Sequence, residues 1–122
     1  MPVIIAKKLK YAGTATLPAL NVETVVIDMP AQQDDYIVEG YVDVNALEPG
    51  DSITIREYVA IDGKNLRVFN TITLDGPTPE PAIRFHTKTL LSHMSYRVTI
   101  TQTAGTPKSF PYAFIVELMD TA

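Results

Sequence analysis

The residues with the clearest chemical potential are Arg56 and Glu57, which interrupt the alternation of apolar and polar residues in DSITIREYVAIDG. Strict alternation puts Glu57 on the same face as Ile55, where an unpaired carboxylate would be costly or would become neutral. Either Glu57 forms a structural ion pair with Arg67 or Arg97, or a β-bulge or edge position turns it toward solvent. The second interpretation is favoured because unpaired charges are rarely buried. Neither predicts hydrolysis, since one acid lacks the second carboxylate in register that such chemistry uses.

The remaining polar residues match no metal or nucleophile motif. The chain has only two histidines, His86 and His93, whereas a zinc site needs three or four ligands at regular spacing. The acidic side chains at expected loop ends are Asp34, Asp35, Asp51, Asp62 and Asp75. Such residues can bind calcium, but they are also ordinary turn formers, and no DxDxDG pattern is present. There is no cysteine, no GxSxG elbow and no glycine-rich phosphate loop. We therefore predict no enzyme, catalytic residue, metal or cofactor.

Charge and hydropathy exclude two classes of partner. The formal charge is −4 and the ten basic residues are scattered, which argues against a nucleic-acid partner. No apolar stretch is long enough to cross a bilayer. The N-terminal MPVIIAKKLK puts an apolar run before the lysines, the reverse of a secretory signal, so we expect synthesis in the cytoplasm without a signal peptide.

The elements that position these residues are predicted to be strands. Val, Ile and Thr account for 36 of the 122 residues, and these side chains suit pleated surfaces. Alternation with a period of two, broken by turn residues such as Asp62-Gly63, predicts strands over 21–28, 36–44, 51–61, 66–74, 82–86, 95–102 and 112–118. Residues 87–94 are expected to form a helical turn. The pattern indicates an all-β fold, a single sandwich of about eight antiparallel strands with jelly-roll or immunoglobulin-like topology.

A chain of this length has room for one core. We expect residues 1–13 to form an N-terminal arm or edge strand and residues 14–122 to form the sandwich. Two exposed segments suit contact with a partner, because one is an apolar strand ahead of lysines and the other is a proline-rich loop that would lose little entropy on binding. The candidate interface residues are Val3, Ile4, Ile5, Pro77, Pro79 and Pro81.

Three segments between Pro49 and Leu118 have a familiar cadence: PGDSITIREYVAIDGKNLRVF, LDGPTPEPAIRF and YRVTITQTAGTPKSFPYAFIVEL. Together they resemble small β-sandwich structural proteins of tailed phages and archaeal viruses. The resemblance implies a virion component that decorates or builds capsids, turrets, necks or tails as a symmetric oligomer. It carries over no catalytic residue.

The sequence therefore predicts a non-enzymatic viral structural protein that acts by self-assembly as a capsid, decoration, turret or other virion component. The expected partners are further copies of the chain and other virion proteins, not nucleic acid, a membrane or a small-molecule substrate. The alternative is a carbohydrate- or calcium-binding sandwich module. Trp is absent, but Tyr41, Tyr58 and Phe69 are expected on the face opposite the core and keep sugar binding open.

Overall fold

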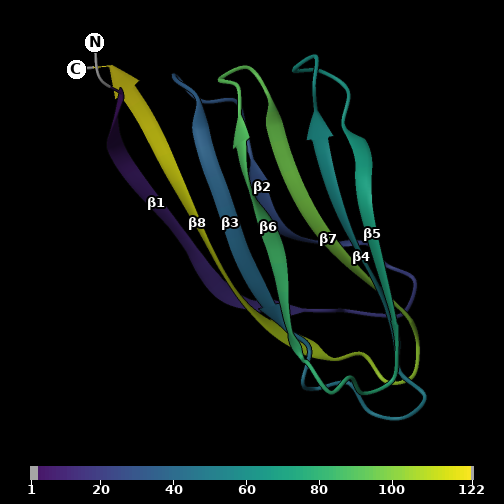
Figure 1. The fold of residues 1–122 in the computed structure, drawn as a ribbon. Helices are drawn as coiled ribbons and strands as arrows, with labels where there is room; N and C mark the ends of the chain where they lie inside the picture. The colour runs from purple at the N-terminus through teal and green to yellow at the C-terminus, as the bar shows by residue number, and fades with distance from the viewer. Residues whose placement is uncertain (1–2, 122) are drawn as a thin grey trace.

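The computed structural model describes residues 3–121, which form eight antiparallel strands and contain no helix (Figure 1). The strands are β1 (Val3–Thr16), β2 (Thr24–Met29), β3 (Tyr36–Asp43), β4 (Ser52–Ala60), β5 (Arg67–Asp75), β6 (Ala82–Leu90), β7 (Ser95–Ala104) and β8 (Ser109–Thr121). The predicted all-β fold of about eight antiparallel strands is confirmed.

The strands form two four-stranded sheets with the orders β1-β8-β3-β6 and β2-β7-β4-β5. The first strand pairs with the last, the second with the seventh, the third with the sixth and the fourth with the fifth. This nesting is that of one long antiparallel hairpin rolled up so that β3 also pairs with β8 and β4 with β7. It is the jelly-roll arrangement, which decides between the two expected topologies. Val3 and Thr121, at the two ends of the described chain, pair with each other, so β1 begins where β8 ends (Figure 1).

The tip of the rolled hairpin is the β4–β5 turn predicted from Asp62-Gly63. Gly63 has a φ of 78°, a conformation that costs glycine little. The Asp62 carboxylate accepts hydrogen bonds from the backbone N–H groups of Lys64 and Asn65, each at 2.8 Å, and from the Asn65 side chain at 2.7 Å. These bonds hold the pKa of the Asp62 carboxyl at about 2, below its usual 3.8.

Two segments differ from the expected elements. Residues 87–90 continue strand β6, and only Leu91–Met94 turn, so the predicted helical turn over 87–94 is wrong. A bulge in β6 interrupts the period of two, which hides the strand from a simple alternation count. At the N-terminus, residues 3–16 form one continuous strand that pairs antiparallel with β8.

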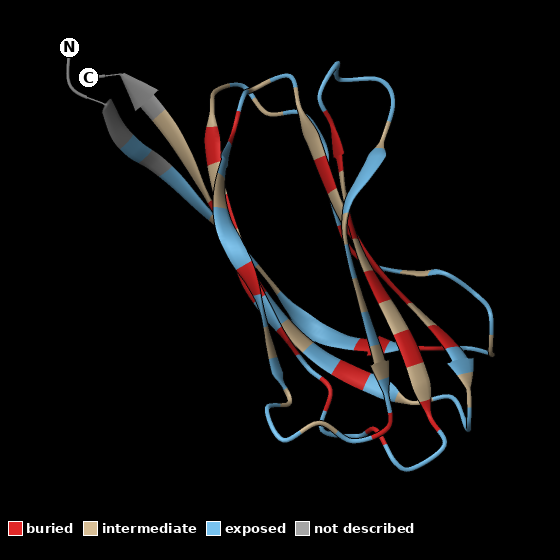
Figure 2. Cartoon of the chain, turned by 45° about the vertical axis from the view of Figure 1, so that its right-hand side comes forward, coloured by how far each residue is buried: buried red, intermediate tan, exposed pale blue. Residues whose placement is uncertain are grey.

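The core lies between the sheets and is built from buried residues of both, and Figure 2 shows these buried positions in red along the strands. Tyr36 and Tyr96 are the largest fully buried side chains, and Phe85 packs on Phe114 with ring centroids 5.2 Å apart. Tyr36 also donates a hydrogen bond of 2.6 Å to the Met94 carbonyl. Burial raises the pKa of the Tyr36 hydroxyl to about 12.

Each of the four edge strands contains a bulge, where the register with its neighbour shifts by one residue. The extra residue is Ala6 in β1, Val26 in β2 and Phe69 in β5, and in β6 it lies at His86–Thr87. A bulge bends its strand and redirects the side chains around it. The bulges of β5 and β6 matter for the site described below.

Gly40 in β3 leaves the space beside its backbone to residues of the neighbouring strand β8. A Cβ atom at this position would lie 2.2 Å from the Phe114 ring and 2.7 Å from the Ala113 carbonyl oxygen. Since the ring is buried and the carbonyl belongs to the backbone, neither can move freely. Phe114 therefore packs in its place only because residue 40 has no side chain.

We expect Gly40→Ala to lower the free energy of unfolding by about 1–3 kcal/mol, the usual cost of overpacking a core. Gly13→Ala is the matched control, because its new Cβ would meet the Tyr112 side chain alone, with the hydroxyl nearest at 3.1 Å, and the outer end of that side chain can shift. Urea unfolding of both variants measures the difference. Equal stability of the two variants would contradict the assigned role of Gly40.

The Asp62 turn predicts a specific dependence on acid. Because the folded pKa of Asp62 lies below its ordinary value, its stabilisation is present above about pH 4 and is lost as the pH falls through about 2. The difference in unfolding free energy between wild type and Asp62→Ala should be constant at neutral pH and shrink toward zero near pH 2. Urea titrations at several pH values test this, with Glu80→Gln as a control for the loss of one surface charge. A difference that stays constant down to pH 2 would refute it.

Candidate functional site

The charged pair singled out in the sequence leads to a buried polar network. Glu57 is only 2% exposed, although it is ionisable and lies in the centre of β4. Its Oε2 atom lies 3.2 Å from Lys88 Nζ and accepts a hydrogen bond of 3.0 Å from the Tyr96 hydroxyl. Its Oε1 atom accepts a hydrogen bond of 3.2 Å from the Asn70 side chain. The carboxylate is thus paired and hydrogen-bonded, as a buried charge must be.

The expected partners of Glu57 were wrong. Arg97 pairs in register with Tyr58 rather than Glu57, so it points to the outer face and binds Asp28 there at 3.1 Å. Arg67 lies beyond the β5 bulge and is exposed. The expectation that Glu57 turns toward solvent was also wrong, because the bulge adds a residue to β5 and leaves the alternation of β4 intact.

Lys88, the actual partner, comes from the opposite sheet and lies in the segment 87–94 for which the sequence predicts a helical turn. Its ammonium group also donates to the His86 carbonyl and lies 3.4 Å from the Tyr96 hydroxyl and 4.8 Å from the centre of that ring. An inward lysine opposite Val38 could have been found only by allowing a bulge after residues 82–86.

The charged groups of this network satisfy one another. Both Glu57 oxygens accept hydrogen bonds, and Lys88 has three oxygen neighbours for its three N–H donors. Burial, followed by the nearby Glu57 charge, raises the pKa of Tyr96 above its usual range and keeps this hydroxyl protonated as a donor. The arrangement joins β4, β5 and β7 of one sheet to β6 of the other.

The acidic loop residues serve the turns that surround the sandwich. Asp51 is buried and accepts hydrogen bonds from the backbone N–H groups of Glu48, at 2.9 Å, and Thr106, at 3.2 Å. Asp34 and Asp35 likewise accept hydrogen bonds from backbone N–H groups. Asp75 accepts one from the Ser52 hydroxyl at 2.8 Å. These contacts are those of turn-forming aspartates.

The two histidines have different surroundings. His93 sits in the β6–β7 turn, and its Nε2 atom lies 2.8 Å from the Ile61 carbonyl oxygen in the β4–β5 turn. It links these two loops. His86 is exposed at the β6 bulge. Within residues 3–121, no group of three or more His, Cys, Asp or Glu side chains is arranged to hold a metal ion.

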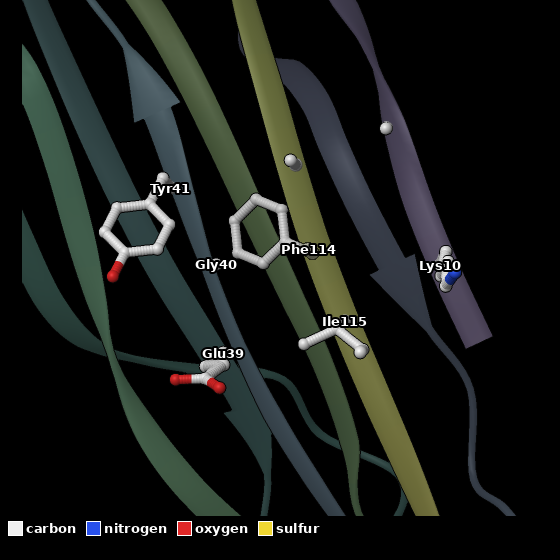
Figure 3. Close-up of a pocket in the computed structure, with 8 residues that line it drawn as sticks. Lys10, Glu39, Gly40, Tyr41, Phe114 and Ile115 are labelled. Atoms are coloured by element: carbon white, nitrogen blue, oxygen red, sulfur yellow. The ribbon is translucent and has the colours of Figure 1, made fainter. Parts of the chain in front are cut away.

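A shallow groove of about 330 Å³ lies on the outer face of the β1-β8-β3-β6 sheet (Figure 3). The register defines two rows of residues across β1, β8 and β3. One row is Lys10–Ile115–Glu39 and the other is Ala12–Ala113–Tyr41. Small residues thus form the floor, Tyr41 stands half exposed at one side, and Lys10 lies at the other. The groove is mainly apolar and has a charge of opposite sign on each flanking strand.

The other proposed contact residues fall on two parts of the surface. Ile5 is about half exposed in β1, while Val3 and Ile4 pair through their backbones with β8 and their side chains lie outside the described residues. Pro77 and Pro79 are exposed in the β5–β6 loop. Pro81 is partly buried and its carbonyl accepts a hydrogen bond from Val44 at 2.9 Å.

Comparison with known proteins finds similarity in fold. No protein-family model matches the chain, and a search of curated proteins finds no relative in sequence. A protein of the Bacillus endospore appendages, a family of disulfide-linked pili, superimposes with a TM-score of 0.58 at 20% identity, covering 95% of this chain and 88% of the other. The VP2 subviral particle of infectious bursal disease virus gives a TM-score of 0.50 at 12% identity, covering 96% of this chain and 32% of VP2. The chain therefore shares a β-sandwich fold with subunits of a pilus and of a viral particle.

No helix among the residues that the structure describes is long and apolar enough to span a membrane.

A double-mutant cycle tests the Glu57–Lys88 pair. Lys88→Met should cost about 3–5 kcal/mol of unfolding free energy, because it leaves the Glu57 carboxylate buried without its cation. Combining it with Glu57→Gln should cost less than the sum of the two single changes. Breaking the exposed Arg97–Asp28 pair by Arg97→Met is the control and should cost about 1 kcal/mol or less. Additive effects at positions 57 and 88 would show that the two residues are not coupled.

Proposed function

We propose that this protein is a non-enzymatic structural subunit that works by association with further copies of itself. The observation that carries the proposal is the groove on the outer face of the β1-β8-β3-β6 sheet, which leaves an apolar surface uncovered on a protein whose buried Glu57 carboxylate is paired inside the sandwich. The shared fold with pilus and viral-particle subunits supports the same reading.

A second copy of the chain fits this groove because the charges beside it are self-complementary. In a two-fold contact, residue i of the first copy meets residue j of the second, and residue j of the first copy meets residue i of the second. Lys10 and Glu39 lie on opposite sides of Ile115 in the same row. When two such faces meet with the Lys10–Ile115–Glu39 rows of the two copies running in opposite directions, Lys10 of each copy can pair with Glu39 of the other. Tyr41 then covers the partner's small-residue floor.

Among self-associating structural subunits, we propose that this protein is a component of a virion. This proposal rests on the resemblance of residues 49–118 to phage and archaeal viral structural proteins, and on the fold shared with the viral particle. A subunit of an extracellular fibre is the second candidate, because this chain and the pilus protein have nearly the same extent whereas VP2 is about three times longer. A fibre of this protein would have to be held without disulfides, since the chain contains no cysteine.

A charge swap tests the self-association. Lys10→Glu and Glu39→Lys should each weaken association at least about tenfold, because each change places like charges together twice in a two-fold contact. The double variant should recover the wild-type affinity. Analytical ultracentrifugation over a wide concentration range gives the affinities, and melting temperatures confirm that the variants are folded.

Lys64→Glu, at an exposed position in the β4–β5 turn, controls for the change in net charge. A wild-type protein that stays monomeric at high concentration and binds no preformed shell would contradict the proposal. Negative-stain electron microscopy of concentrated protein then separates the finer assignments, since a shell component should give closed or shell-bound particles and a fibre subunit should give filaments.

A further inference from the structure

A second concavity lies at the side of the sandwich, where edge strand β5 of one sheet faces edge strand β6 of the other. This lateral cleft has a volume of about 440 Å³, larger than the groove on the outer face. Its lining comes from β4, β5 and β6: Glu57, Phe69, Asn70, Ile72, Arg84, His86 and Lys88. The size is within the range of small-molecule sites in proteins.

The two bulges shape this cleft. Phe69 is the extra residue of β5, inserted where Glu57 pairs with Asn70 and Tyr58 with Val68. The extra residue of β6 lies between Phe85 and Lys88, next to His86. Bulges at sheet edges often redirect a side chain at a functional site. Here both bulges lie beside the same cleft and bring side chains from two sheets to its walls.

The floor of the cleft is electrically neutral and its rim is positive. Glu57 and Lys88 neutralise each other at 3.2 Å. Arg84 is exposed and belongs to none of the ion pairs formed among the described residues. His86 is exposed beside it. A ligand entering the cleft therefore meets an uncompensated guanidinium group at the entrance and no net charge beneath.

The walls combine this cation with a flat apolar surface. The Phe69 ring is about half exposed and lies 6.4 Å, between ring centres, from the Tyr96 ring. Ile72 extends the apolar wall, and the Asn70 amide, which uses one N–H on Glu57, adds further hydrogen-bonding capacity. A guanidinium group is suited to hold a carboxylate through two parallel hydrogen bonds, and an aromatic ring can stack against a flat ligand face.

We propose that the lateral cleft binds a small organic carboxylate with a flat, ring-sized body. Arg84 holds the carboxylate, the ring of Phe69 covers the flat face, and the Asn70 amide contacts a polar substituent. Aromatic acids and sugar acids share this chemistry. The cleft is lined from β4, β5 and β6 and shares no lining residue with the groove, although Arg84 pairs in register with Tyr41 at the side of the groove.

Titration with benzoate and glucuronate, each compared with a neutral counterpart (benzamide and methyl glucoside), tests the proposal on the full chain. Isotope-labelled protein observed by NMR should show shifts confined to residues of the lateral cleft, including Phe69 and Arg84. At least one of the two acids should bind at least about tenfold more tightly than its neutral counterpart, because the charge-assisted contact to Arg84 is lost in the neutral compound. Which acid binds identifies the source of the ligand.

Arg84→Gln should reduce the affinity for the acid at least about tenfold. Phe69→Ala, made separately, should reduce the affinity more than Arg84→Gln does, or abolish binding. Arg67→Gln and Val68→Ala, at exposed positions of β5 outside the cleft, are the matched controls and should leave binding unchanged. Melting temperatures establish that each variant is folded. No shifts with either acid, equal binding of the neutral compounds, or equal loss in Arg67→Gln would overturn the proposal.

Discussion

The ion pair between Glu57 and Lys88 joins one sheet to the other through the interior of the sandwich, where most other contacts are between apolar side chains. Apolar contacts are non-directional and tolerate small displacements, whereas a buried carboxylate is stable only when each partner is in place. A slip of β4 by one residue would turn Glu57 outward and carry its apolar neighbours with it. The network of Glu57, Lys88, Tyr96 and Asn70 is therefore the contact on which the relative placement of the two sheets depends.

Much of the strand content followed from the sequence, because alternation and turn residues are local properties. The β4–β5 hairpin was visible in Asp62-Gly63, and the period of two identified most strands. The order of the strands was not visible, since it depends on how the long hairpin rolls up, and no local pattern encodes that step. The partners of Glu57 were missed for the same reason: Lys88 is distant in sequence, and the β6 bulge concealed the strand that carries it.

The groove could not be predicted from the sequence either, although the exposure of one of its residues could. Tyr41 was expected to face away from the core, and it does. Its neighbours across the sheet, Ala113 and Ala12, become its neighbours only through the β3–β8 and β1–β8 pairings. The sequence favours the proline loop and Ile5 as contact residues because of their expected exposure and apolar character, whereas the groove combines apolar character with a shape and two opposite charges. Exposure can be estimated from one residue, but shape requires several strands in register.

The bulges have a consequence for how this protein meets other β-strands. An edge strand offers unpaired backbone groups to any extended chain, and a bulge interrupts that offer by bending the strand. In β2, β5 and β6 the bulge leaves only short regular runs, whereas in β1 it lies near the N-terminal end and leaves residues 7–16 regular. Of the four edges, β1 is thus the one with room for a long added strand, and its lysines at positions 7, 8 and 10 would select an acidic one. An extended chain that adds to an edge of this sandwich would therefore find its longest regular partner on β1, and none of comparable length on the other three edge strands.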